Sequence, residues 1–287
     1  MLTKPKQIIL DKSALQGTKL DQLQCFAKDH CLLICEPLLY ECATSSVFKD
    51  RQLLSRCRAL IQDGAYYCSR GEDLIRHEGQ HLRLFPWLLA DIEKTARIRS
   101  GPVESDDAFS EEQIAAKQDL GFEFAKVFLL DPVRELIDSA GDGHSEVPDF
   151  RGLPKDIFAR LAGFAKSIDG VSFRNPAITR VPKDWIRDDK KYCLSSEWMA
   201  WQFFRLLDIV LREYLYLHQG GGSLGGKRAE HDYQDLGYVL LLCRADGILT
   251  KDKSLVEPLA RAAFPEKDVF SSLEEVPDSY RCDWACP

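Results

Sequence analysis

Short apolar runs alternate with amphipathic segments at the start of the chain. Residues Gln7–Leu10 and Cys31–Cys35 are almost wholly apolar, which is typical of strands buried on both faces of a parallel sheet. Between them, Leu20–Ala27 has the helical period, with Thr18 as its expected N-cap. Pro37 then favours the first turn of another helix. The order strand, helix, strand, helix predicts an α/β fold with a parallel sheet.

The same order returns near the other end of the chain. A helix is predicted around Leu236–Cys243, a strand over Gly247–Thr250, a helix over Ser254–Ala263 and a short strand near Val269. Because both ends share this order, we expect them to form one three-layer sandwich, in which helices flank a central parallel sheet.

The middle of the chain is mostly helical by its periodicity. We therefore expect a discontinuous α/β core of residues 1–45 and 226–287, interrupted by a large, mainly helical insertion of residues 46–225. The longest helical stretch, Ser195–His218, is apolar nearly all round and is expected to be central and buried. Its one polar stripe should be paired internally or face a cleft, and consists of Gln202, Arg205, Asp208 and Arg212.

The charge of the chain limits which partners it can bind. With 38 basic and 45 acidic residues among 287, the formal net charge is -7, which excludes a uniformly basic nucleic-acid-binding surface. The charge is unevenly distributed. Residues 101–149 hold 13 acids and 3 bases, a net of -10, whereas residues 151–191 hold 10 bases and 5 acids, a net of +5. A local basic groove is therefore compatible with the composition.

The apolar segments are too short for a membrane protein. The longest stretch without Asp, Glu, Lys or Arg is Tyr214–Gly226, well below the ~18 apolar residues of a membrane span. The run Ile8–Leu10 is too short for a signal-peptide core. Ten cysteines among 287 residues are far fewer than the ~8–10% of a disulfide scaffold. We expect a cytoplasmic protein with structural or free thiols and no membrane partner.

Acidic residues stand where predicted strands end or helices begin. Asp11 ends the first strand, Glu41 lies one turn into the helix after the second, and Asp252 follows the late strand. Asp232 and Asp235 lie at the start of the helix before that strand. Taken singly, each acid is also an ordinary helix cap or surface residue. Because ligands bind at the carboxyl ends of parallel strands, we expect these carboxylates to converge there.

Such a cluster would be crowded with negative charge. All of its carboxylates would be ionised at neutral pH, which is unfavourable unless protons or cations offset the charge. Oxygen ligands without histidine favour Mg²⁺ or Mn²⁺ over zinc. A pair of such ions activates water and stabilises the leaving oxygen in phosphodiester hydrolysis. The sequence therefore predicts an acidic metal site and a hydrolase that acts on phosphodiester bonds.

A second pattern, His77–His81, spells H-E-x-x-H, which on a helix holds zinc with Glu78 as the base. Gly79 weakens the helix that has to align the ligands. A third ligand would have to come from Glu93 or Glu111. A zinc metalloprotease is therefore a remote alternative to a polar loop or helix end.

A third pattern, Gly221–Lys227, satisfies the phosphate-loop motif G-x-x-x-x-G-K. Arg228 follows it in place of the Ser or Thr that holds magnesium, and a helix precedes it where a phosphate loop needs a strand. We therefore interpret this segment as a connector.

At four places the sequence resembles the PIN-domain family of nucleases. These places fall within residues 7–45 and 229–272, and they are Ile8–Leu15, Leu38–Glu41, His231–Asp235 and Ile248–Asp252. Members of that family have a parallel sheet flanked by helices. They cleave RNA, less often DNA, with Mg²⁺ or Mn²⁺ held by Asp, Glu, Asp and Asp. The chain departs from them in length, since 193 residues separate Glu41 from Asp235, where the family usually has a few tens.

The resemblance implies a role for each acid of the predicted site. It gives Asp232 as an alternative to the third acid. It also implies that the hydroxyl groups of Ser13 and Thr250 support the metal-binding acids without binding the metal themselves. By position, the catalytic acids and metal ligands are Asp11, Glu41, Asp235 and Asp252.

Two functions of different classes follow. The first is a Mg²⁺- or Mn²⁺-dependent endoribonuclease with a two-metal-type mechanism, whose RNA substrate is bound by the basic segment. The second is a non-catalytic PIN-like module, whose helical insertion docks a protein partner or a second copy of the chain. In the basic segment, cationic side chains for phosphates alternate with the aromatic rings of Phe173, Trp185 and Tyr192 for base stacking, although a solvated surface is an equal interpretation. The candidate nucleic-acid-binding residues are Arg174, Arg180, Lys183, Trp185, Arg187, Lys190 and Lys191.

Overall fold

A sheet of five strands forms the centre of the molecule. The computed structural model describes residues 5–44, 48–84, 89–100, 125–141, 148–168, 196–222 and 225–282. All five strands are parallel, in the order β3-β2-β1-β4-β5. The predicted α/β fold with a parallel sheet is therefore confirmed. The strands are β1 (Gln7–Leu10), β2 (Cys31–Cys35), β3 (Tyr66–Cys68), β4 (Gly247–Leu249) and β5 (Asp268–Phe270).

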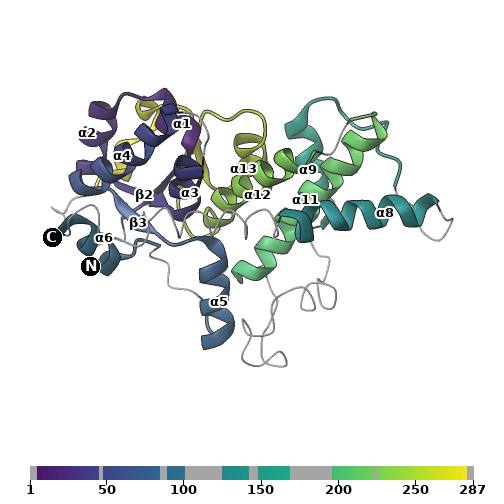
Figure 1. The fold of residues 1–287 in the computed structure, drawn as a ribbon, viewed down its shortest axis with the longest axis horizontal. Helices are drawn as coiled ribbons and strands as arrows, with labels where there is room; N and C mark the ends of the chain where they lie inside the picture. The colour runs from purple at the N-terminus through teal and green to yellow at the C-terminus, as the bar shows by residue number, and fades with distance from the viewer. Residues whose placement is uncertain are drawn as a thin grey trace.

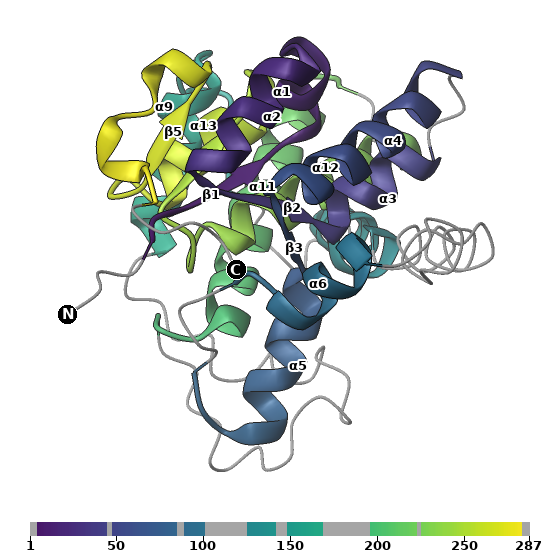
Figure 2. The same cartoon turned by 90° about the vertical axis from the view of Figure 1, so that its left-hand side faces the viewer.

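Helices cover both faces of this sheet (Figure 1, Figure 2). On one side, α2 (Leu20–Asp29) packs on β2 and on α4 (Phe48–Asp63). On the other side, α12 (Gly226–Leu241) packs on α13 (Val256–Ala263), which contacts β5. Every residue of β1, β2 and β4 is buried, because the helices exclude water from both faces.

Shorter helices connect these layers. Helix α1 (Lys12–Gly17) follows β1 after one residue, and α3 (Glu36–Thr44) follows β2 directly. Helix α3 also contacts α12, so it links the carboxyl end of β2 to the second helical layer. The N-cap position of α2 is Lys19 and not the expected Thr18, because Thr18 ends α1.

A second group of helices lies beyond α12 and α13. Figure 1 shows α8, α9 and α11 on the side of these two helices that faces away from the sheet, while α5 extends below. The π-helical turn η3 (Lys126–Leu130) directly precedes α8. The second residue of α8 is Pro132, which has no amide hydrogen to donate to this turn. The helices are α5 (Gly71–His81), α8 (Asp131–Gly141), α9 (Ile157–Ile168) and α11 (Met199–Gln219).

The sheet extends into the segment that was expected to be an insertion. Strand β3 pairs with β2, and α6 (Ile92–Ser100) packs on both β3 and α4. The expected core boundary at residue 45 is therefore wrong for the sheet, which takes one strand from residues 46–225. The reason is that β3 has only three residues, too few for a strand period to show in the sequence.

The cysteines that the structure describes agree with the expectation of structural or free thiols. Eight cysteines in the described ranges are free thiols. Those in β2 and β3 are buried and pack as small apolar side chains. None of the helices that the structure describes is long and apolar enough to cross a membrane.

Helix α11 is the longest helix of the described part and is largely buried, as expected. Its polar stripe is paired internally. Arg205 Nη1 donates to the Ala263 carbonyl at 2.6 Å, and Arg212 Nε donates to the Asp208 carboxylate at 2.9 Å. Arg205 therefore joins α11 to α13, and Arg212 is paired within α11.

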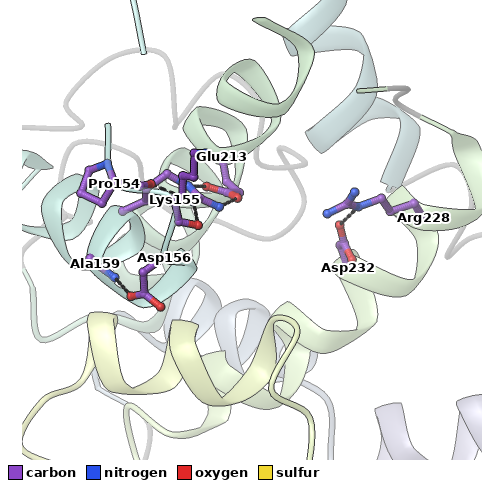
Figure 3. Close-up of polar contacts among 8 residues, drawn as sticks. Pro154, Lys155, Asp156, Ala159, Glu213, Arg228 and Asp232 are labelled. Carbon is purple, nitrogen blue, oxygen red and sulfur yellow. Dashed lines mark hydrogen bonds and ion pairs between the residues drawn. The ribbon is translucent and has the colours of Figure 1, made fainter. Parts of the chain in front are cut away.

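A buried ion pair ties α9 to α11. Arg160 Nε donates to Glu213 Oε2 at 2.9 Å, and Arg160 Nη2 donates to Oε1 at 2.5 Å. Both side chains are at most 6% exposed. Arg160 Nη1 also donates to the carbonyls of Pro154 and Lys155. Figure 3 shows Glu213 beside these two carbonyl groups. The charge is paired and hydrogen-bonded, as a buried charge has to be.

We expect Glu213→Gln to destabilise the protein by about 3 kcal/mol, because it leaves the Arg160 charge buried without a counter-charge. The matched control is Asp208→Asn, on the same helix, which breaks the part-exposed pair with Arg212 and should cost about 1 kcal/mol or less. Urea unfolding monitored by circular dichroism measures both changes. Equal losses in the two variants would contradict this role of the buried pair.

Candidate functional site

Asp11 stands at the carboxyl end of β1. Leu10 pairs with Leu249 of β4, and the Asp11 amide donates to the Leu249 carbonyl at 3.1 Å. The Asp11 carboxylate is 2% exposed and accepts hydrogen bonds from Ser13 Oγ at 2.5 Å and Thr250 Oγ1 at 2.6 Å. Burial raises the pKa of Asp11 and the two hydroxyl groups lower it, so burial prevails.

The same two hydroxyl groups organise the loop that follows β4. The Lys251 amide donates to Ser13 Oγ at 2.7 Å, and the Asp252 amide donates to Thr250 Oγ1 at 3.0 Å. Asp252 Oδ1 accepts from the amide and hydroxyl groups of Ser254, each at 2.5 Å. These bonds fix Asp252 within the loop that follows β4, and its charge raises the pKa of Asp11.

Glu41 reaches the same edge of the sheet from α3. It is 7% exposed, and the phenol of Tyr238, on α12, donates a short hydrogen bond to its Oε2. Burial raises the pKa of Glu41 from 4.5 to about 7, against the lowering effects of Tyr238 and of the Lys12 charge. The charges of Asp11 and Asp252 raise this pKa further, which indicates that all three carboxylates lie within electrostatic reach.

Asp235 is the fourth acid and comes from α12. Its pKa is raised well above the usual value, first by burial and then by the charges of Glu41, Asp252 and Asp11. No hydrogen-bond donor to its carboxylate is found within the ranges that the structure describes. Among the acids of the cluster, Asp235 is therefore the one whose buried negative charge is least offset by hydrogen-bond donors.

Asp232, the alternative third acid, is engaged elsewhere. Its Oδ2 accepts from the phenol of Tyr214, on α11, at 2.7 Å and from Arg228 Nε at 3.4 Å. Figure 3 shows the Arg228 contact. These partners tie Asp232 to α11 and to the start of α12. Between the two candidates, the geometry favours Asp235 as the third acid.

The donor set fits a hard divalent cation. It consists of carboxylate oxygens whose negative charges raise the pKa of the neighbouring acids, and a cation would offset this charge. Among the described residues, no group of three His, Cys, Asp or Glu side chains is arranged to hold a metal ion. Mg²⁺ does not need such a group, because it usually keeps several waters and takes one or two carboxylates plus substrate phosphates. Asp11 and Asp235 are the two acids best suited to hold it, with Asp252 and Glu41 beside them.

The H-E-x-x-H segment lies on α5, but its glutamate has a structural role. Glu78 is fully buried, accepts a hydrogen bond from the Met199 amide at 2.9 Å and pairs with Arg244 at 2.8 Å. A buried, ion-paired carboxylate is poorly suited to act as a base for water. The pattern therefore stabilises the contact of α5 with α11.

The glycine-rich segment joins α11 to α12, as expected of a connector. Gly221 has a positive φ of 82°, a conformation that favours glycine. The Gly222 amide donates to the Leu217 carbonyl at 2.8 Å, which ends α11. A helix precedes the segment, so the strand that a phosphate loop requires is missing at this point.

The structure does not test the predicted role of the basic segment in binding nucleic acid. All of its named residues, from Phe173 to Tyr192, lie outside the described residues. Its role in nucleic-acid binding stays a prediction.

Two residues of the site were not anticipated from the sequence. Tyr238 contacts Glu41, and Lys12 acts on it electrostatically. Lys12 directly follows Asp11, and Tyr238 lies three residues after Asp235, on the same helix face. In the sequence, only these spacings from Asp11 and Asp235 could have indicated that Lys12 and Tyr238 belong to the site.

Comparison with known proteins adds no relative. No family model, no curated protein and no solved structure matches the chain. Any statement on function therefore depends on the residues of the site.

We expect the free energy of unfolding, measured with a chelator present, to fall as the pH rises from 5 to 8. The pKa of Glu41 is about 7 in the folded protein, against an ordinary 4.5, so the folded state binds the proton more tightly and loses this advantage through that window. Asp11 and Asp235 shift in the same direction. The measurement is urea unfolding at both pH values.

Glu41→Gln is the control for this pH dependence. It removes one of the shifted groups, so its stability should fall less between pH 5 and pH 8 than that of the parent. Loss of the Glu41 charge also lowers the pKa of Asp235, which reduces the pH dependence in the same direction, and the shifts of groups outside the cluster are common to both proteins. Identical declines would show that Glu41 does not titrate as described.

Proposed function

We propose that this protein is a PIN-like nuclease that hydrolyses phosphodiester bonds, with RNA as its substrate class and Mg²⁺ or Mn²⁺ as its cofactor. The observation that carries the proposal is the convergence of four carboxylates at the carboxyl edge of the parallel sheet. They come from the residue after β1, from α3, from α12 and from the loop after β4, and the charges of the other three raise the pKa of Asp235. Such crowding is unfavourable unless a cation or proton offsets it.

The position of the cluster also supports this function. In open α/β sheets, ligands bind outside the carboxyl ends of the strands, and β1 and β4 are adjacent central strands. The order and the strand contexts of the acids are those of the PIN-domain resemblance. For the second function, a non-catalytic module, no specific contact among the described residues provides support. The RNA-cleavage experiment distinguishes it from the nuclease.

The residues of the chain supply ligands, orientation and charge. A divalent cation bound at this site supplies activation of water and stabilisation of the leaving oxygen. Ser13 and Thr250 orient Asp11 through hydrogen bonds. Asp235 keeps its oxygens available to the cation. Lys12, whose charge acts on Glu41, is suited to contact the negatively charged scissile phosphate.

We expect the protein to cleave single-stranded RNA with Mn²⁺ and to lose cleavage with a chelator. Asp11→Asn and Asp252→Asn should each lower the rate on the order of 100-fold or more, the scale of losing a group that stabilises transition-state charge. Cleavage of a labelled RNA under single-turnover conditions measures these rates, and circular dichroism checks that each variant is folded.

Asp278→Asn is the matched control, because its carboxylate is 90% exposed and lies outside the cluster. It should cleave RNA like the parent. A folded parent that binds RNA but does not cleave it with either metal favours the non-catalytic module. Equal cleavage by the parent and by both site variants would overturn the assignment of the acids.

A further inference from the structure

One acid of the cluster is held by a buried tyrosine from a different helix. Tyr238, on α12, is fully buried, and its phenol donates a short hydrogen bond to Glu41 Oε2 on α3. Glu41 itself is nearly buried. A buried carboxylate cannot exchange such a donor for bulk water without cost. The bond therefore restricts the orientation of the Glu41 carboxylate.

Helix α12 contributes to the cluster twice. Asp235 and Tyr238 are three residues apart, which puts them on the same face of the helix. One is an acid of the cluster, and the other holds the acid of α3. The rotation of α12 about its axis thus sets the position of Asp235 and the orientation of Glu41 together.

Close packing fixes α12 against α3 at this point. A Cβ atom on Gly237, the residue before Tyr238, would lie 3.3 Å from Pro37 Cγ of α3, which is tighter than an ordinary contact. At Leu240, about one turn further along the same face of the helix, the start of α5 is so close that a Cβ on Gly71 would lie 2.4 Å from Leu240 Cδ2. Two glycines therefore allow α12 to sit in a narrow space, where its rotation is restricted.

We propose that Tyr238 is a positioning residue of the metal site, which holds the Glu41 carboxylate in the orientation required for binding the divalent cation. This inference rests on the proposed function, because it assigns the group that orients one of the acids. Groups that hydrogen-bond to metal-binding carboxylates orient them, and their loss typically weakens metal binding about 10- to 100-fold.

The competing interpretation is that the Tyr238 bond only stabilises the fold. In that case its loss would lower stability without changing the affinity for the cation. The chain offers a matched control on the same helix. The phenol of Tyr233, which is also buried, donates to Glu72 Oε1 at 3.0 Å, and Glu72 is outside the acidic cluster. Tyr233→Phe removes a comparable hydrogen bond of α12 without touching a proposed ligand.

The experiment is a Mn²⁺ titration of the parent, Tyr238→Phe and Tyr233→Phe, at one pH and one salt concentration. Electron paramagnetic resonance of free Mn²⁺ gives the dissociation constant without any need for catalysis. We expect Tyr238→Phe to raise this constant about 10-fold or more, and Tyr233→Phe to leave it near the parent value. Cleavage by Tyr238→Phe should fall at limiting Mn²⁺ and recover at saturating Mn²⁺.

The outcomes separate this inference from the function on which it rests. A parent that neither binds Mn²⁺ at the cluster nor cleaves RNA contradicts the proposed function, and the inference with it. A parent that does both, with equal dissociation constants in the parent and the two tyrosine variants, overturns only the role of Tyr238. Equal weakening by both tyrosine variants also overturns it, because it indicates a general loosening of α12.

A second variant covers the case in which Tyr238→Phe does not fold. Gly237→Ala puts a methyl group 3.3 Å from Pro37 Cγ and should displace α12 from α3 by a few tenths of an ångström while it retains the phenol. We expect a smaller loss of Mn²⁺ affinity than for Tyr238→Phe. An unchanged affinity in a folded Gly237→Ala protein would contradict the coupling of α12 to Glu41.

Discussion

The pairing of β1 with β4 is the contact on which the rest of the structure depends. It joins Asp11 to Thr250, two residues that are 239 positions apart, and it fixes Leu10 opposite Leu249. A slip of one residue would turn the side chains of β4 to the opposite face of the sheet and separate Thr250 from Asp11. The acids and hydroxyl groups meet because this register is held. Everything between the two strands, including the helices beyond α12, has to return the chain to this pairing.

The cluster assembled at this edge opposes the stability of the fold. Burial is the largest cause of the raised pKa values of Asp11, Glu41 and Asp235, so the folded protein holds these carboxylates where their charge is disfavoured. Compensation differs along the cluster. Asp11 has two hydroxyl donors, Glu41 has the Tyr238 phenol and the Lys12 charge, and Asp235 has no donor within the described part. Sites that bind ligands commonly depart from the most stable arrangement in this way.

The sequence was sufficient for those features that depend on local patterns. Strands β1 and β2 could be predicted because both of their faces are covered and their residues are apolar throughout, and Asp11 could be placed because it directly follows β1. The sequence was not sufficient where contacts between residues far apart in the chain determine the structure. Strand β3 is too short to show a period, and Tyr238 has the pattern of a core residue, since its role depends on a contact with Glu41 across 197 positions. Asp232 and Asp235 lie on the same helix, α12, and the sequence does not show that Asp232 is bound by Tyr214 and Arg228.

The central claim is that the acids at the carboxyl edge of β1 and β4 hold a divalent cation. The most direct measurement is anomalous X-ray scattering at the manganese absorption edge, from crystals of the full chain grown with Mn²⁺. We expect an anomalous peak at the cluster, within about 2.2 Å of a carboxylate oxygen of Asp11 and of a second acid, Asp235, Asp252 or Glu41. A crystal in which Mn²⁺ occupies other sites while these carboxylates contact only water or protein would contradict the claim.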